Sequence, residues 1–124
     1  MVQRFAKQIT ASLLLGLLAT HAIAHTTVIG TSPKSGSTLE QSPPSIEVSF
    51  REAVRLTSVV AVEAGKAERK LEFTPTDSAA TFTVNEPKLG PGRNEIRWKA
   101  LSKDGHVISG TLIFVIQPAA AKTN

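Results

Sequence analysis

The sequence predicts an all-β protein that folds as a Greek-key antiparallel β-sandwich of about seven strands. Three observations support this prediction. Short segments of alternating apolar and polar residues recur along the chain, and turn residues separate them at intervals of about 8–12 residues. No segment between residues 26 and 117 has the apolar periodicity of a helix. The 124 residues include no cysteine, so disulfide bonds, thiolate metal sites and cysteine nucleophiles are excluded.

The first half of the chain contains three predicted strands. Residues 26–31 are rich in β-branched side chains, which favour a strand. Loops rich in Pro, Ser and Gly follow at residues 32–37 and 41–44. Apolar residues alternate with polar ones over residues 46–50, and the valine-rich residues 59–62 form the next predicted strand.

The second half contains four more predicted strands. Apolar residues alternate at residues 71–73 and 82–84, and turns with Pro and Gly follow at residues 87–92. Alternation returns at residues 96–98 and again along a long closing strand at residues 108–116. The apolar side chains on one face of these strands are expected to form the core: Ile46, Val48, Phe50, Phe82, Val84, Ile96, Trp98, Leu112 and Phe114.

The amino-terminal segment has the pattern of a cleavable signal peptide. Arg4 and Lys7 provide a positive start, and residues 11–19 form an apolar run that is too short for the roughly 20 residues of a membrane span. Small residues then precede a predicted cleavage site after Ala24. An uncleaved membrane anchor or a buried helix is the alternative interpretation of this segment.

Cleavage would divide the chain into a signal peptide, residues 1–24, and one mature domain, residues 25–124. Removal of the signal peptide lowers the net charge from +4 to +2, which is too small to indicate a nucleic-acid partner. We therefore expect an exported, periplasmic domain that does not insert stably into the membrane after processing. Its first residue would be His25, and its only other histidine would be His106.

An amino-terminal histidine is an unusually good metal chelator. The free α-amine of His25 and its Nδ1 could close a six-membered ring on one metal ion, and because the two donors are already linked, the second binds with little further loss of entropy. A second candidate lies in Lys103-Asp104-Gly105-His106, where Asp104 and His106 are two positions apart and project to the same side of an extended chain. Taken alone, this motif is also compatible with an ordinary hairpin turn.

The two candidates together favour one Cu(II) ion per mature chain. They supply an amine, two imidazoles and a carboxylate, and tetragonal coordination by nitrogen and oxygen suits Cu(II). Zinc would prefer four ligands in a tetrahedron, and Cu(I) would prefer sulfur ligands. The mature domain has no sulfur ligand, because cysteine is absent and the only methionine is Met1.

Three stretches and the expected amino terminus resemble the CopC family of periplasmic copper-resistance proteins. The stretches are T-S-P-K-S-G-S-T-L at residues 31–39, P-P-S-I-E-V-S-F-R-E-A-V at residues 43–54, and W-K-A-L-S-K-D-G-H-V-I-S-G-T-L-I-F-V at residues 98–115. With His25 at the start, the resemblance extends to residue 117. It implies a cupredoxin-like Greek-key β-sandwich, related to immunoglobulin-like sandwiches.

The resemblance also implies which residues hold the metal. The amino-terminal histidine and the D-G-H motif of the family fall on His25, Asp104 and His106. Glu52 matches a family glutamate near the site, and we expect it to orient a ligand histidine or the amine; the alternative is an exposed acid at a strand end. The chain departs from the family at Ala53, where proline is usual, and it lacks the Met-rich segment that gives some members a Cu(I) site.

These observations predict a non-enzymatic Cu(II)-binding protein that sequesters or delivers copper. The expected partners are the copper ion and either an inner-membrane copper transporter or another periplasmic copper protein. Two alternatives belong to other classes. One is a copper-dependent oxidase that uses an amino-terminal histidine, although the single tryptophan and the absence of tyrosine disfavour a sugar-binding face. The other is a metal-free β-sandwich for protein contacts, which would leave the combination of His25, Asp104 and His106 unexplained.

Overall fold

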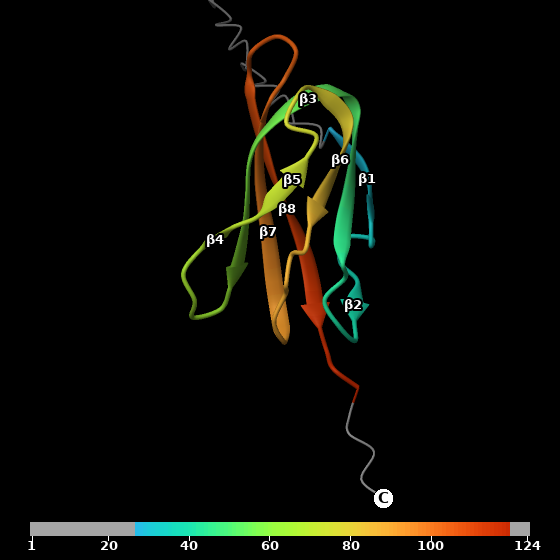
Figure 1. The fold of residues 1–124 in the computed structure, drawn as a ribbon, viewed down its shortest axis with the longest axis vertical. Coiled ribbons are helices and arrows are strands. Elements are labelled where there is room, and N and C mark those ends of the chain that lie inside the picture. The colour runs from blue at the N-terminus through green and yellow to red at the C-terminus, as the bar shows by residue number, and fades with distance from the viewer. Residues whose placement is uncertain (1–26, 120–124) are drawn as a thin grey trace, which may run out of the picture.

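The computed structural model describes residues 27–119, and within this range the protein contains eight strands (Figure 1). No helix in these residues is long and apolar enough to cross a membrane. The strands are β1 (Val28–Ser32), β2 (Thr38–Leu39), β3 (Ser45–Glu63), β4 (Arg69–Lys70), β5 (Glu72–Thr74), β6 (Ala79–Asn85), β7 (Gly92–Leu101) and β8 (Val107–Ile116).

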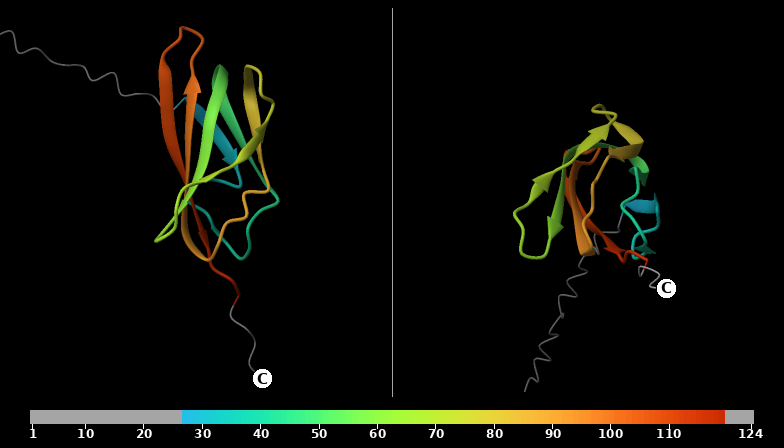
Figure 2. Two further views of the ribbon diagram at one scale, coloured as in Figure 1. Left: turned by 60° about the vertical axis from the view of Figure 1, so that its left-hand side comes forward. Right: turned by 60° about the horizontal axis from the view of Figure 1, so that its bottom comes forward.

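The long strand β3 joins the two layers of the sandwich. Its first half pairs with β1 and β6, and β5 follows beyond β6. Its second half pairs with β7 and β4, and β8 and the short β2 extend that layer beyond β7. Figure 2 shows the two layers facing each other, with β3 passing from one to the other. The predicted all-β sandwich is therefore confirmed.

Two details differ from the sequence prediction. The segments at residues 46–50 and 59–62, which we expected to be separate strands, are parts of the continuous strand β3. No Gly or Pro lies within β3 to end it, and a register shift between Ser49 and Val54 lets the strand bend instead. The sheet is also not wholly antiparallel, since β2 pairs with β8 in parallel over two residues.

The predicted core lies between the layers. All its residues are at most 4% exposed. The ring of Phe50 packs edge-on against Phe82 and Trp98, with centroid separations of 5.8 and 5.1 Å. Gly110 on β8 lies opposite Trp98 on β7, and a Cβ atom at this glycine would lie only 2.6 Å from the indole ring. The core is therefore a close-packed aromatic cluster that extends to the backbone of β8.

The bend of β3, the β5–β6 turn and the β7–β8 turn gather at one end of the sandwich (Figure 1). The β3–β4 and β6–β7 loops lie at the opposite end, together with the end of β8. The candidate metal-binding residues within the described range all belong to the first of these ends.

Candidate metal centre

The tight turn between β7 and β8 carries Asp104 and His106. The amide of Ser102 donates to the carbonyl of His106 at 2.8 Å, and the amide of Gly105 donates to the carbonyl of Ser102 at 2.9 Å. Gly105 adopts a φ of 85°, a left-handed conformation that glycine adopts without steric cost. The two candidate ligands therefore lie on a short turn whose backbone is fixed by its own hydrogen bonds.

The side chains of Asp104 and His106 contact each other directly. Nδ1 of His106 lies 2.8 Å from Oδ2 of Asp104, and Oδ1 of Asp104 accepts a hydrogen bond from the hydroxyl of Ser102. Both side chains are open to solvent, with 81% of His106 and 68% of Asp104 exposed. The structure thus brings the predicted pair together at the surface, where a metal ion could reach it.

The electrostatics of the turn favour an ionised carboxylate. The hydrogen bond from the Ser102 hydroxyl is the largest influence that holds the pKa of Asp104 below its ordinary value, and His106 acts in the same direction. An ionised carboxylate only accepts hydrogen bonds, so Nδ1 of His106 carries the proton that lies between the two side chains. Nε2 is then the unprotonated nitrogen of a neutral His106 ring.

The two donor atoms are joined by a hydrogen bond, and they are close enough to bind one metal ion once that bond is broken. Two ligand atoms, each about 2.0 Å from a metal and about 90° apart, lie about 2.8 Å from each other. Nδ1 of His106 and Oδ2 of Asp104 are 2.8 Å apart. A metal bound to both atoms would displace the Nδ1 proton, as metal binding to imidazole generally requires.

The pair does not form a complete metal site within the described residues. Across residues 27–119, no group of three or more His, Cys, Asp or Glu side chains is arranged to hold a metal ion. The third predicted ligand, His25, lies outside the residues that the structure describes. A site of the predicted composition therefore depends on a donor from before residue 27.

The start of β1 lies at the same end of the molecule as the turn. The carbonyl of Thr27 accepts a hydrogen bond of 2.7 Å from the amide of Arg51, at the bend of β3. The first described residue is therefore hydrogen-bonded to the bend of β3, on which Glu52 lies.

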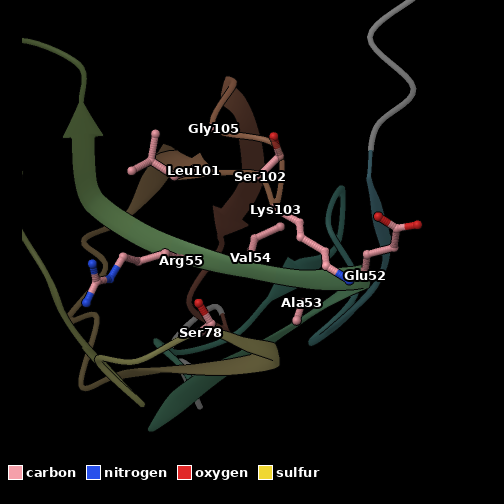
Figure 3. A pocket seen from close by; sticks show the side chains of 9 residues that line it. All are labelled: Glu52, Ala53, Val54, Arg55, Ser78, Leu101, Ser102, Lys103 and Gly105. Atoms are coloured by element: carbon pink, nitrogen blue, oxygen red, sulfur yellow. The ribbon is translucent and has the colours of Figure 1, made fainter.

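Glu52 lies on the bend of β3 and lines an open hollow together with Ser102, Lys103 and Gly105 of the β7–β8 turn (Figure 3). In Figure 3 the side chain of Lys103 extends from the turn toward Glu52. The structure thus places Glu52 beside the turn, although no hydrogen bond within residues 27–119 joins it to Asp104 or His106. Strand β3 continues without interruption through Ala53, the position at which the family usually has proline.

Ser102 is a contact residue that the sequence analysis did not identify. Besides the bond to Asp104, its hydroxyl accepts a hydrogen bond of 3.2 Å from the amide of His106. The signal was present in the sequence as Ser-x-Asp-x-His, because residues two and four positions apart can meet across a tight turn.

The CopC domain model matches residues 28–117, which are most of the chain and include both the bend of β3 and the turn. The chain belongs to the CopC family. This match confirms the resemblance to the family that the sequence motifs indicated. Proteins of the family are not enzymes, so the prediction of a non-enzymatic protein is also confirmed. No curated protein matches the chain.

Solved structures with the CopC fold agree with the architecture. CopC from Methylosinus trichosporium OB3b has a TM-score of 0.64 and 23% identity, over 80% of this chain and all of that one. PcoC from Escherichia coli, described as a methionine-rich copper resistance protein, has a TM-score of 0.56 and 20% identity, over 73% and 96% of the two chains. A second PcoC structure, with selenomethionine, has a TM-score of 0.55 and 17% identity, over 73% and 98%. At these identities the likeness establishes the fold alone.

Proposed function

We propose that this protein binds one Cu(II) ion per mature chain through His25, Asp104 and His106, and that it serves copper resistance or homeostasis by sequestering or delivering the ion. The observation that carries the proposal is the solvent-exposed pair of Asp104 and His106, whose donor atoms are 2.8 Å apart in a CopC-family fold. This pair supplies two of the four donors that a tetragonal Cu(II) site uses.

His25 would supply the other two donors, its α-amine and Nδ1. The resulting set of three nitrogens and one oxygen matches the preference of Cu(II) for tetragonal coordination by nitrogen and oxygen. The arrangement requires cleavage after Ala24, because only then is the amine of His25 free. The signal peptide at residues 1–24 and a periplasmic location are therefore parts of the same proposal.

Copper in the reduced state would bind far more weakly. Cu(I) prefers thiolate and thioether ligands, and the chain has no cysteine and a single methionine at position 1. In this respect the chain differs from PcoC, which is described as methionine-rich. A role in holding the oxidised ion, rather than the reduced one, follows from this composition.

Glu52 would orient the amino terminus without binding the metal. Glu52 lines the same hollow as residues of the β7–β8 turn. The residue before it, Arg51, is hydrogen-bonded to Thr27. Carboxylates near a metal site often fix the orientation of a ligand by accepting its remaining proton. Because Asp104 and His106 are exposed, the bound ion could also be transferred to a protein partner, either an inner-membrane copper transporter or another periplasmic copper protein.

A chelator-competition titration of the mature protein tests the proposal. We expect one tight equivalent of Cu(II), a loss of affinity by orders of magnitude in His106→Ala, and a smaller loss in Asp104→Asn. Asp77→Asn is the matched control, because Asp77 is an exposed carboxylate on the β5–β6 turn at the same end of the sandwich. Equal affinity in all four proteins would contradict the proposed site.

A further inference from the structure

Ser102 is hydrogen-bonded to both candidate ligands of the β7–β8 turn, Asp104 and His106. Its hydroxyl donates to Oδ1 of Asp104 and accepts from the amide of His106 at 3.2 Å. Its own amide donates to the carbonyl of His106 at 2.8 Å. A hydroxyl has one proton to donate and two lone pairs, so a single serine can satisfy both side-chain contacts at once.

We infer that Ser102 is a positioning residue, whose hydroxyl holds one oxygen of Asp104 so that the other stays beside the ring of His106 and the two donors are close together before the metal arrives. This inference rests on the proposed copper site. Ser102 would not bind the metal itself, but it would hold Asp104 and His106 in position to bind it.

The exposure of the two ligands explains why such a residue is needed. With 68% and 81% of their surfaces exposed, Asp104 and His106 have little packing to restrict their rotamers. Ser102 is less exposed than these two residues. It directly follows β7, and its backbone is hydrogen-bonded across the turn. The Ser102 hydroxyl therefore ties the exposed carboxylate of Asp104 to the end of the sheet.

The test compares Ser102→Ala with Ser102→Thr in the mature protein. Alanine removes the hydroxyl and threonine retains it. Ser78→Ala is the matched control, since Ser78 lines the same hollow but makes no described hydrogen bond to Asp104 or His106. The first measurement is of the imidazole ¹⁵N chemical shifts of His106 in the metal-free protein. It is made at one fixed pH, about two units above the ordinary imidazole pKa of about 6.5. The second is Cu(II) affinity by chelator competition.

We expect the wild type, Ser102→Thr and Ser78→Ala to carry the His106 proton mainly on Nδ1, since Asp104 accepts it there. In Ser102→Ala the proton should be distributed over both nitrogens, and Cu(II) affinity should fall by about 10- to 100-fold, the usual effect of losing a group that orients a ligand. Unchanged shifts and affinity in Ser102→Ala would overturn the inference, as would an equal loss of affinity in Ser102→Thr.

The two measurements separate this inference from the proposed function. Weak Cu(II) binding by the mature wild type would refute the copper site. The metal-free ¹⁵N shifts would still decide whether Ser102 fixes the Asp104–His106 pair.

Discussion

The two ends of the sandwich use polar side chains in opposite ways. At the β7–β8 turn, Ser102, Asp104 and His106 bond to one another, within five residues of the chain. At the other end, Arg69 donates to the carbonyls of Pro87 and Lys88 at 2.7 and 3.0 Å, and so links β4 to the β6–β7 loop.

The second end contains further bonds from side chain to backbone. Glu63 accepts from the amide of Gly90 at 3.3 Å. The fully buried Asn94 donates from Nδ2 to the carbonyls of Gly90 and Gly92, at 2.8 and 3.0 Å. The bonds of Arg69 and Glu63 join distant parts of the chain, and Asn94 is buried, so these groups stabilise the fold. Asp104 and His106 are exposed and bond only within their own turn, so they remain available to a ligand. The comparison predicts that substitutions at one end change stability and that substitutions at the other change copper binding.

The largest expected effect concerns the amino terminus. One additional alanine before His25 converts its amine into an amide, which is a poor ligand, and removes the six-membered chelate. Cu(II) affinity should fall by orders of magnitude, with little change in the melting temperature of the metal-free domain. Chelator competition and thermal denaturation on the mature, extended and His25→Ala proteins measure both quantities.

The extended protein should resemble His25→Ala more than the mature one. Equal affinity in the extended and mature proteins would show that the amine is not a ligand.

Acid should release copper before it unfolds the domain. The α-amine and imidazole ordinarily titrate at about 7.7–8.0 and about 6.5, so protons compete with copper as the pH falls from neutral to about 4–5. Affinity should drop about tenfold per pH unit for each proton displaced. Affinity that is constant over this interval would argue against amine and imidazole ligands.

The fold should lose stability only at lower pH. The hydrogen bond from Lys66 holds the pKa of Glu63 below 4.5, and hydrogen bonds from Arg97 and Arg93 do the same for Glu95. A carboxyl with a depressed pKa in the folded state contributes stability above its ordinary pKa, and this contribution is lost as the pH falls through the depressed value. Circular dichroism recorded alongside the copper titration should therefore show a folded domain at the pH of release.

Gly110→Ala should destabilise the core without changing the metal ligands. The new Cβ would lie 2.6 Å from the buried ring of Trp98, and overpacking of this kind costs about 1–3 kcal/mol. Gly30→Ala is the matched control, because nothing lies within 4 Å of a Cβ at that glycine on β1. Denaturant unfolding measures both variants, and equal stability in the two would show that the ring moves aside freely.

A smaller loss is expected at the end of the sandwich that lacks the candidate ligands. Arg69→Ala removes the bonds to the β6–β7 loop, and its partial exposure to solvent limits the cost to about 1 kcal/mol. Cu(II) affinity should stay at the wild-type value. A change in affinity comparable to that of Asp104→Asn would contradict the prediction that this end affects stability and not copper binding.

Alternation along the strands predicted nine of the core residues, because inward and outward positions follow directly from the two-residue period of a strand. It did not predict others that are also buried, such as Val54, Leu56 and Val59. It could not show that residues 46–50 and 59–62 form one strand, since the bend of β3 is a register shift and not a turn with Gly or Pro. Similarly, the spacing of Asp104 and His106 predicted that their side chains project to the same side, but the role of Ser102 depends on backbone bonds that close the turn. The position of His25 and the predicted cleavage remain predictions.

The central claim is that one tetragonal Cu(II) site is formed by the amino terminus and the β7–β8 turn. The most direct test is the electron paramagnetic resonance spectrum of the mature protein, starting at His25, with one equivalent of Cu(II). The account predicts a single tetragonal species with predominantly nitrogen ligands, which is lost or altered in His106→Ala. A mixture of weakly bound species that is identical in the wild type and in His106→Ala would contradict it.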